Sequence, residues 1–427
     1  MPQYRHLTES VFTWAAPPIK FGLGAIAECG FDLEQLGVHR CLVMTDAGVA
    51  ATGVIDEVVS HLNTAGISIE IYDRVAVEPT DRSIQEAIDF AATSKWDGFL
   101  AVGGGSVIDT AKAVNLVSTH GGSLMDYIVK PVGAGMAPKG SLKPLLAVPT
   151  TAGTGSESTA IAVVDLLDLH LKAGISHPLL RPTMAIVDPL VSVTLAPEVT
   201  AASGMDVLTH AIESYTARKF DRRPAYQSPR QRVAFAGANP ISDMFCERAI
   251  TLVGRHLRSA VLNGYDLEAR YGMMLAAMYA GIGFGNAGTH IPHANAYPVA
   301  GQVRNYHPRG YPEMPMVPHG QAVASTAIPA FRFTYPTAPG RHLKSASLLN
   351  GRDVDPVLGE EALPTVLRSL MRDINVPRSI GAFGFTEHDV EALAEGTMKQ
   401  KRQLAASPRV LALESAVTIF RQSLLED

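Results

Sequence analysis

The sequence predicts two domains: an α/β domain built on a parallel sheet over residues 1–195, and an all-helical domain over residues 196–427. The chain has 427 residues, which exceeds the size at which a single hydrophobic core usually stops growing. In the first half, short apolar runs alternate with longer amphipathic segments, a pattern typical of βαβ units. Beyond residue 195, helical periodicity continues with few strand candidates.

The first half alternates strands and helices in a regular order. The expected strands are 40–46, 67–73, 98–105 with its turn, and 143–150, and the expected helices are 54–66, 81–94 and 106–119. The apolar run 184–189 ends this alternation. Strands joined through helices of this length run parallel to one another, so the sequence predicts a parallel sheet.

The second half is expected to be helical. The periodic segments are 196–217, 241–263, 267–285, 362–374 and 387–400. Two stretches, 216–240 and 301–318, are irregular and rich in Pro, Arg and aromatic residues, so they are expected to be loops.

The composition favours a compact protein that acts on small molecules. Hydrophobic residues make up 47% of the chain and charged residues 18%, and the net charge of −5 disfavours nucleic acid as a partner. No stretch of eighteen apolar residues and no secretory leader pattern is found, so a cytoplasmic protein that does not enter a membrane is expected. The three cysteines, Cys29, Cys41 and Cys246, are expected to be buried and inert.

A glycine-rich turn stands between a strand and a helix in "AVGGGSVIDTAKA", residues 101–113. Gly103, Gly104 and Gly105 permit a positive φ and a close backbone approach, and the free N–H groups at a helix start can bind a phosphate. Ser106 could add a hydroxyl donor, and Lys112 could neutralise either Asp109 or the ligand. The alternative is that the glycines only make room for packing.

Two further polar stretches follow predicted strands. Asp46, in "MTD", could accept from a ribose hydroxyl and repel a 2′-phosphate, which would favour NAD over NADP. An ordinary helix cap is the alternative. The hydroxyl groups of "VPTTAGTGSES", residues 148–158, suit ribose and nicotinamide, although a solvated turn would have a similar composition.

Potential metal ligands gather in the second half. Asp206 and His210 are four residues apart on a predicted helix and share one face, and His290, His293 and His319 follow in "GTHIPHANAYP" and "MVPHGQAV". One carboxylate and three imidazoles would fill most of the coordination sphere of a divalent metal and leave a position for substrate. Each histidine taken alone is more often a satisfied core residue.

The chain resembles the iron-containing (group III) alcohol dehydrogenases over nearly its full length. The resemblance is carried by "GGGSVIDTAKA", "PTTAGTGSE", "DVLTHAIESY", "GIGFGNAGTHIPHANAYP" and "VPHG", in the family's order. It implies a Rossmann-like domain followed by a helical domain, as in the dehydroquinate synthase-like fold. Within the family, "YDRVAVEPTD", "NPISD" and "DLEAR" are most similar to the hydroxyacid-oxoacid transhydrogenases.

The resemblance also implies roles for individual residues. The metal ligands would be Asp206, His210, His293 and His319, which leaves His290 outside the coordination sphere. Iron is the expected metal, and zinc would also suit these ligands. The NAD(H) site would comprise Asp46, Gly103, Gly104, Gly105, Ser106, Asp109, Thr150, Thr151, Thr154 and Lys172.

Two positions depart from the family pattern. Tyr297 stands where many of the alcohol dehydrogenases have another histidine, so it is expected to relay a proton, to position the substrate or to form an aromatic wall. Glu78, in "VEPT", stands where asparagine is common, and a different cofactor affinity is expected.

The expected activity is hydride transfer through NAD(H) between small alcohols or hydroxyacids and aldehydes or oxoacids. The transhydrogenases oxidise 4-hydroxybutyrate to succinate semialdehyde while reducing 2-oxoglutarate to 2-hydroxyglutarate; the alternative is an ordinary NAD-dependent alcohol dehydrogenase. A non-catalytic protein is disfavoured by the intact ligand set. The relatives also imply a homo-oligomer, a dimer or larger.

Arginines on the two loops are candidates for binding a substrate carboxylate. Arg304 and Arg309 lie between two of the expected metal ligands and are the first choice. The other loop offers Arg218, Arg222, Arg223, Arg230 and Arg232. A solvated basic loop is the alternative in both cases.

Overall fold

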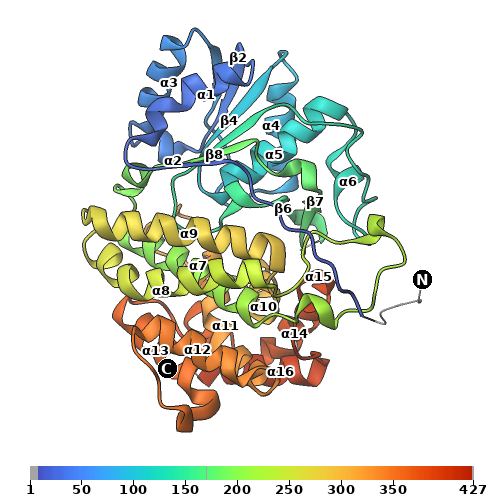
Figure 1. The fold of residues 1–427 in the computed structure, drawn as a ribbon, viewed down its shortest axis with the longest axis vertical. Helices are drawn as coiled ribbons and strands as arrows, with labels where there is room; N and C mark the ends of the chain where they lie inside the picture. Colours follow the sequence, from blue (N-terminus) through green and yellow to red (C-terminus); the bar gives the residue numbers. More distant parts are fainter. Residues whose placement is uncertain (1–7, 170, 426–427) are drawn as a thin grey trace, which may run out of the picture. The chain divides into compact units, whose positions relative to one another are not determined.

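The computed structural model describes residues 8–169 and 171–425 (Figure 1). It divides into two units, one formed by Ala16–Leu195 and the other by Ala196–Asp427 together with Met1–Ala15.

Six parallel strands form the sheet of the first unit, in the order β1-β8-β5-β4-β2-β3. They are β1 (Ile19–Phe21), β2 (Arg40–Met44), β3 (Ser68–Tyr72), β4 (Gly98–Gly103), β5 (Leu145–Pro149) and β8 (Met184–Val187). Every residue of β4 and β5 is buried, as expected for central strands of a sheet with both faces covered.

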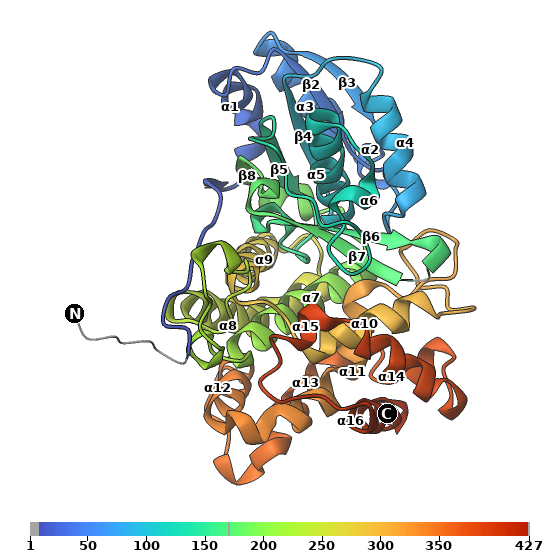
Figure 2. The same ribbon diagram turned by 90° about the vertical axis from the view of Figure 1, so that its right-hand side faces the viewer.

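Helices cover both faces of this sheet. In β2, Cys41 and Val43 belong to the core formed with α1 (Cys29–Gln35) and α3 (Val54–Thr64). The alternate residues of the strand face the core formed with α4 (Asp81–Ala91) and α5 (Gly105–His120). Figure 2 shows α1 and α4 on opposite sides of the strands. This α/β unit confirms the predicted fold class of the first half.

The connections reverse direction at β2. Its neighbours are β3 on one side and β4 on the other, so the chain winds outward in both directions from the gap between β2 and β4. In doubly wound sheets, ligands bind beyond the carboxyl ends of the strands at such a switch point. The fold alone therefore indicates a ligand site after Met44 and Gly103.

A separate antiparallel hairpin lies between β5 and β8 along the chain. It consists of β6 (Ile161–Leu166) and β7 (Leu171–Ser176). The sequence analysis placed no strand over these ranges, nor over the three residues of β1. β1 has three residues and pairs with β8, which is distant in the sequence, so local periodicity does not reveal it. The β6–β7 hairpin is formed by neighbouring segments and was missed.

The second unit has no strand of a sheet in its described residues. Its helices are α7 (Pro197–Thr216), α8 (Pro240–Leu262), α9 (Leu267–Ala287), α10 (Ile291–Gly301), α11 (His319–Thr334), α12 (Pro339–Asn350), α13 (Ala362–Asp373), α14 (Val390–Met398), α15 (Lys401–Leu404) and α16 (Leu413–Leu425). Side-chain caps mark the first turns of two of these helices. Asn239 accepts from the Ser242 N–H at the start of α8, and Asp266 accepts from the Ala269 N–H at the start of α9.

Residues 8–15 pack with the helical unit, although they were predicted to belong to the first domain, 1–195. The Glu9 N–H donates to the Arg223 carbonyl (2.8 Å), and the Ala15 N–H donates to the Asn286 side chain (2.9 Å). These partners lie more than 200 positions away along the chain. The assignment of these residues to the first domain is corrected, because local sequence carries no signal for such distant contacts.

The three cysteines are buried and free, as predicted. Burial raises the pKa of the Cys29 thiol to about 12. None of the helices in the described ranges combines the length and the apolar character needed to cross a membrane.

Candidate functional site

The glycine turn lies at the carboxyl end of β4, where α5 begins. None of its three glycines has a left-handed φ; that of Gly104 is −71°. A Cβ on Gly103 would lie 2.4 Å from a methyl group of Val107, and a Cβ on Gly105 would lie 2.4 Å from the Thr154 hydroxyl. The expectation of a positive φ is therefore wrong, because close packing is what requires glycine here.

Two polar side chains that follow the turn are engaged within the protein. The Ser106 hydroxyl donates to the Val77 carbonyl. Asp109 accepts from the Val163 N–H (2.9 Å) and from the Ser156 hydroxyl. An anion at this turn would therefore meet the backbone N–H groups that begin α5, which have no partner within the helix.

Lys112 is wholly buried beneath the turn. Its Nζ lies 2.7 Å from the carbonyl and the hydroxyl oxygens of Ser156, 2.7 Å from the Ile161 carbonyl and 3.3 Å from Asp109. Burial lowers the pKa of this amine, and the Asp109 charge opposes that shift. Lys112 thus holds the Thr/Ser-rich loop against α5. Of the two partners that the sequence left open, a ligand or Asp109, it neutralises Asp109.

Three neighbouring strands end in polar groups at the same edge of the sheet. Asp46 follows β2 and caps α2 (Ala47–Ala50) by accepting from the Val49 N–H (3.0 Å), so the alternative interpretation as a helix cap holds. Thr150 follows β5, and its N–H donates to the Gly103 carbonyl (3.1 Å). Its hydroxyl is buried without a hydrogen-bond partner among the residues described, and is therefore available to a ligand.

The other predicted threonines lie on the same loop. The Thr154 hydroxyl accepts from the Ser156 N–H (3.3 Å), and Thr151 is half-buried beside Gly104.

Lys172 and Glu78, which the sequence analysis considered separately, form an ion pair. Lys172 lies on β7 and is only 9% exposed, and Glu78 lies on the loop after β3. The pair joins the hairpin to the loop whose Val77 carbonyl accepts from Ser106. It therefore connects three segments of this unit next to the glycine turn.

In the helical unit, three of the predicted metal ligands come together. Asp206 on α7, His293 on α10 and His319 at the start of α11 each offer a ligand atom, and these atoms all lie within 4.8 Å of one another. Asp206 Oδ1 is 3.4 Å from His293 Nε2 and 3.9 Å from His319 Nε2.

The fourth predicted ligand, His210, lies at the edge of this group. Its Nδ1 is 3.6 Å from Asp206 Oδ1, but the ring is outside the compact set of three. The His210 ring stacks on Phe284, with centroids 3.9 Å apart, and lies 4.2 Å from the His293 ring. A helical spacing of four residues places it on the same face of α7 as Asp206.

The chemistry of these atoms fits a bound cation. Asp206 Oδ1, His210 Nδ1 and His293 Nε2 are all buried, and within the described ranges none has a hydrogen-bond partner. Burying unpaired polar atoms is costly. Converging carboxylate and imidazole atoms can be satisfied together by one divalent metal ion.

The sequence analysis missed one residue of this centre, Glu213. Its carboxylate is wholly buried and makes two contacts: Oε1 accepts from His293 Nδ1 (2.5 Å), and Oε2 accepts from the His290 N–H (2.5 Å). The first contact directs His293 Nε2 toward Asp206, where it can offer a lone pair to a cation once its own proton is displaced. A carboxylate that orients a metal-binding histidine in this way is common in metal sites. Its position in "DVLTHAIESY", three residues after His210, was the available signal.

His290 contacts Glu213 and does not belong to the group of converging ligand atoms. Its Nδ1 accepts from the Ile291 N–H (2.8 Å), so its Nε2 carries the proton and donates to the Thr216 hydroxyl (3.1 Å). Burial lowers the pKa of His290 to about 4, which keeps the ring neutral.

Opposing electrostatic effects act on the cluster. Burial favours the neutral form of Asp206, but the neighbouring histidines hold its pKa well below the usual range. Burial also lowers the pKa of His293, yet the carboxylates of Glu213 and Asp206 raise it to about 10 overall. For His210, burial dominates and lowers the pKa to about 3. Without a metal the cluster thus combines the ionised Asp206 with a protonated His293 and a neutral His210, and a cation bound at His293 Nε2 would take the place of the proton.

Replacing Glu213 with Gln should weaken metal binding about 10- to 100-fold, as is typical when a partner of a ligating histidine is lost. The amide removes the charge that fixes the His293 proton on Nδ1. The affinity would be measured by competition with a chelator, and the absorption spectrum of the cobalt-loaded protein would report the ligand geometry. Gln at Glu247, a carboxylate on α8, is the control. Unchanged affinity and spectrum in the Glu213 variant would contradict the positioning role.

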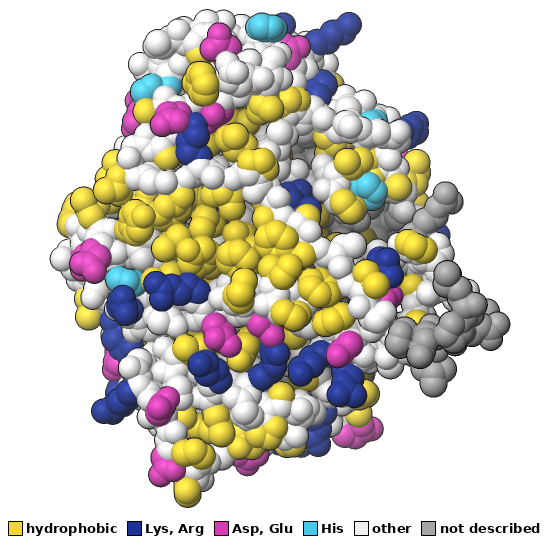
Figure 3. Space-filling model, viewed as in Figure 1, with side chains coloured by type: hydrophobic (Ala, Val, Ile, Leu, Met, Phe, Trp, Pro, Cys, Tyr) yellow, Lys and Arg dark blue, Asp and Glu magenta, His cyan; other side chains and the backbone are white. Residues whose placement is uncertain are grey.

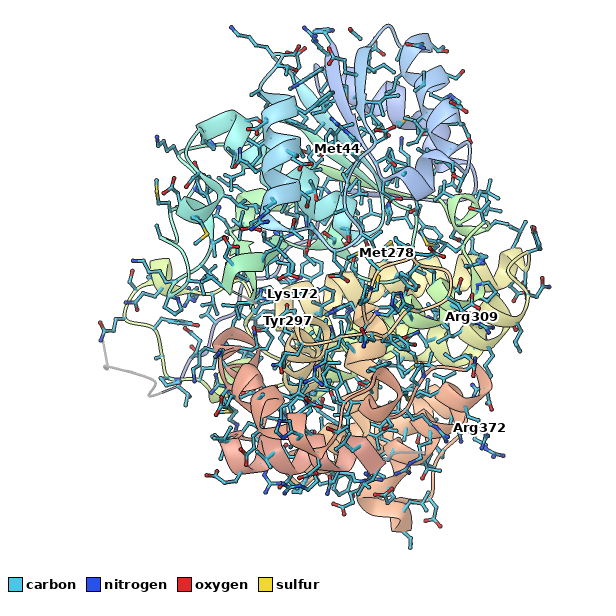
Figure 4. The ribbon with its side chains drawn as sticks, turned by 180° about the vertical axis from the view of Figure 1, so that it is seen from behind. Met44, Lys172, Met278, Tyr297, Arg309 and Arg372 are labelled. Carbon is cyan, nitrogen blue, oxygen red and sulfur yellow. The ribbon has the colours of Figure 1, made fainter. Side chains whose placement is uncertain are left out.

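The remaining candidates are spread over the unit. The Tyr297 ring lies 6.2 Å from the His319 ring and nearly parallel to it, which places this side chain beside the ligand set. Arg304 is 65% exposed and pairs with Asp389 (2.5 Å). Arg309 is exposed, and Figure 4 shows it well apart from Tyr297. The carboxylate clamp assigned to these two arginines stays a prediction, and this geometry gives it no support.

A doubly wound sheet with polar groups at its switch point and a buried Asp/His cluster in a helical unit are the features expected of a metal-dependent dehydrogenase. The chain belongs to the iron-containing alcohol dehydrogenase family. The model "Iron-containing alcohol dehydrogenase" matches residues 16–189, and the model "Fe-containing alcohol dehydrogenase family, C-terminal" matches residues 233–424.

Two relatives extend the match over nearly the whole chain. The mitochondrial hydroxyacid-oxoacid transhydrogenase of Xenopus tropicalis is 42% identical over 98% of this chain and 91% of its own length. The Homo sapiens protein of the same name is 40% identical over 98% and 90%. A solved 1,3-propanediol oxidoreductase is 30% identical, with a TM-score of 0.85, over 97% of this chain and all of its own. The predicted fold and family are confirmed.

The prediction of a cytoplasmic protein is contradicted by these comparisons, because the relatives are named as mitochondrial. The prediction rested on composition and on the absence of a secretory pattern. Neither observation distinguishes the compartments in which a folded enzyme can work.

Proposed function

We propose that this enzyme is a hydroxyacid-oxoacid transhydrogenase that transfers hydride through a tightly held NAD(H). Its substrates would be 4-hydroxybutyrate and 2-oxoglutarate, and its products succinate semialdehyde and 2-hydroxyglutarate. The observation that carries the proposal is the buried cluster of unpaired Asp and His atoms, found in a chain that is similar over nearly its full length to proteins named for this activity.

The first unit would hold the nucleotide at its switch point. The N–H groups after Gly103, Gly104 and Gly105, together with that of Ser106, would bind the pyrophosphate, with Asp46 at the adenosine ribose. The nicotinamide side would meet the orphaned Thr150 hydroxyl. Thr151 and Thr154 would complete the site, and Asp109 and Lys172 would hold its loops in place through their contacts with Ser156 and Glu78.

The second unit would hold the metal through Asp206, His210, His293 and His319. We propose Fe²⁺, with Zn²⁺ as the other ion that suits the same ligands. When bound, the metal supplies Lewis-acid polarisation of the substrate oxygen. Glu213 keeps His293 in the tautomer that ligation requires, and Tyr297 is positioned beside His319 to orient the substrate or to hold its hydroxyl proton.

The two half-reactions balance. Hydride leaves C4 of 4-hydroxybutyrate for NAD⁺ while the hydroxyl proton leaves the oxygen. The same hydride then moves from NADH to C2 of 2-oxoglutarate, whose oxygen takes up a proton. NAD is regenerated in each cycle, so no free nucleotide is consumed.

Steady-state kinetics of the metal-loaded enzyme test this function. With 4-hydroxybutyrate and 2-oxoglutarate but no added NAD, we expect turnover with ping-pong kinetics. An ordinary NAD-dependent alcohol dehydrogenase is the second candidate, since it shares the family. Turnover only with added NAD and without an oxoacid would establish the second candidate instead.

We also propose a homo-oligomer, a dimer or larger, with no nucleic acid or membrane partner. Apolar side chains gather on the face shown in Figure 3, which includes α8 and α9. Large exposed apolar residues of these two helices and of their connection are Met244, Leu262, Tyr265, Leu267 and Tyr271. Exposed apolar patches of this kind commonly mark association surfaces, and light scattering would measure the mass of the assembly.

A further inference from the structure

A loop and the β6–β7 hairpin both contact the start of α5, where the proposed nucleotide site lies. The loop, residues 73–80, connects β3 to α4. The Ser106 hydroxyl in the first turn of α5 donates to the Val77 carbonyl of this loop. The Val163 N–H of the hairpin donates to Asp109 of the same helix (2.9 Å). Both segments are therefore attached to the first two turns of α5.

The loop and the hairpin are also joined to each other. The Asp165 N–H of β6 donates to the Pro79 carbonyl (2.8 Å), which places Asp165 beside Thr80 in a short parallel bridge. Glu78, the residue before Pro79, forms its ion pair with Lys172 of β7. The junction thus combines a backbone contact, which does not depend on the side chains, with one ion pair that does.

The Glu78–Lys172 ion pair is largely shielded from water. The Lys172 side chain is 7% exposed and the Glu78 side chain 28%. Another ion pair of this unit connects α4 to the same hairpin, between Arg82 and Asp168 (2.9 Å), but those side chains are 67% and 79% exposed. Exposed ion pairs contribute little, and shielded ones are less screened by water and salt. Glu78 and Lys172 are therefore expected to hold the two segments together more strongly.

The register of the hairpin gives Lys172 a second acidic neighbour. Asp165 stands directly opposite Lys172 in the antiparallel ladder. Side chains in that relation share one face of the sheet, with Cβ atoms about 5 Å apart. Removing the charge of Glu78 therefore leaves the Lys172 amine close to another carboxylate. Such a change breaks the connection to the loop and preserves the hairpin itself.

The position of the loop connects this ion pair to the nucleotide. In the proposed site, the pyrophosphate lies on the N–H groups that begin α5, and Val77 contacts Ser106 in that same turn. Release of a bound ligand is commonly limited by the opening of the loops beside it. A loop fixed to the hairpin on one side and to α5 on the other opens less readily than a loop with one attachment.

We propose that the Glu78–Lys172 ion pair holds this loop against the hairpin and thereby slows the release of NAD(H). This rests on the proposed function, in which one nucleotide carries hydride from the hydroxyacid to the oxoacid without leaving. Glu78 and Lys172 are positioning residues in this account, because they act through the loop and not on the reacting atoms. Loss of the pair would favour exchange of the cofactor with free nucleotide.

The release rate is measured by loading the metal-containing enzyme with radiolabelled NAD⁺, adding excess unlabelled NAD⁺ and following the retained label by rapid filtration. We expect Glu78→Gln and Lys172→Met each to accelerate release about tenfold or more, and Lys172→Arg to keep it slow. The double variant should release no faster than the faster single variant, because both changes remove the same contact. The matched control is Asp168→Asn, which breaks the exposed ion pair and should stay within about twofold.

Release within about twofold of the unmodified enzyme in both single variants would overturn the proposal. So would faster release that the Asp168 variant shares, or that accompanies a lower melting temperature of the nucleotide-free protein, because general loosening of the unit would then be the cause. The unmodified enzyme tests the proposed function separately. If it released its nucleotide faster than it turned over, the captive cofactor would be wrong, while acceleration in the Glu78 variant would still support the role of the ion pair.

Discussion

Asn in place of Asp206 is expected to abolish metal retention and to slow hydride transfer about a thousandfold, because Lewis-acid polarisation contributes several kcal/mol to such a step. Asp206 is the residue from which the distances to His210, His293 and His319 are all below 4 Å. An amide oxygen is a much weaker ligand than a carboxylate. Metal content after gel filtration and single-turnover rates would measure the two effects.

The matched control is Glu198→Gln, which removes a carboxylate from the same helix, eight residues earlier. It should retain both the metal and the rate. Circular dichroism of the metal-free proteins would establish that the Asp206 variant is folded. If that folded variant kept a full complement of metal and its activity, the metal centre would have to be placed elsewhere.

Met in place of Lys112 is expected to reduce the stability of the first unit by about 3–5 kcal/mol, the usual cost of removing one partner of a buried ion pair. Asp109 would lose its compensating charge, and the loop carrying Ser156 and Thr159 would lose its attachment to α5. For a unit of this size, the melting temperature should fall by about 10 °C. Nucleotide binding should weaken as well, because the same loop carries Thr150.

Lys95→Met, at an exposed position of the same unit, is the control and should leave the melting temperature unchanged. Combining Lys112→Met with Asp109→Asn should recover part of the loss, since no buried charge is then left alone. If the Lys112 variant had the same melting temperature as the unmodified protein, this amine would not hold the loop.

Much of the fold was predictable because its signals are local. The apolar runs of β2, β4 and β5 and the amphipathic helices between them specify a parallel sheet. The glycine turn after β4 predicts a nucleotide site at the carboxyl edge of the sheet. The spacing of Asp206 and His210 places both on one helix face, and His293 and His319 complete a pattern whose chemistry is specific.

What the sequence did not predict depends on contacts between distant segments. Ser106 and Lys112 turn inward because Val77 and Ser156 lie beneath them, and nothing near them in the sequence shows this. The sequence around Glu213 is that of an ordinary helix. Its role becomes visible only through the contact with His293 on α10. The pairing of Arg304 with Asp389 also joins segments far apart in the sequence, and the carboxylate clamp stays a prediction.

The central claim is that hydride passes from a hydroxyacid to an oxoacid through a nucleotide that does not leave the enzyme. The most direct measurement uses 4-hydroxybutyrate deuterated at C4, 2-oxoglutarate, and an excess of unlabelled NADH in solution. The account predicts that deuterium appears undiluted at C2 of 2-hydroxyglutarate. Deuterium that is diluted into the free nucleotide pool would contradict the account and identify a dehydrogenase that exchanges its cofactor.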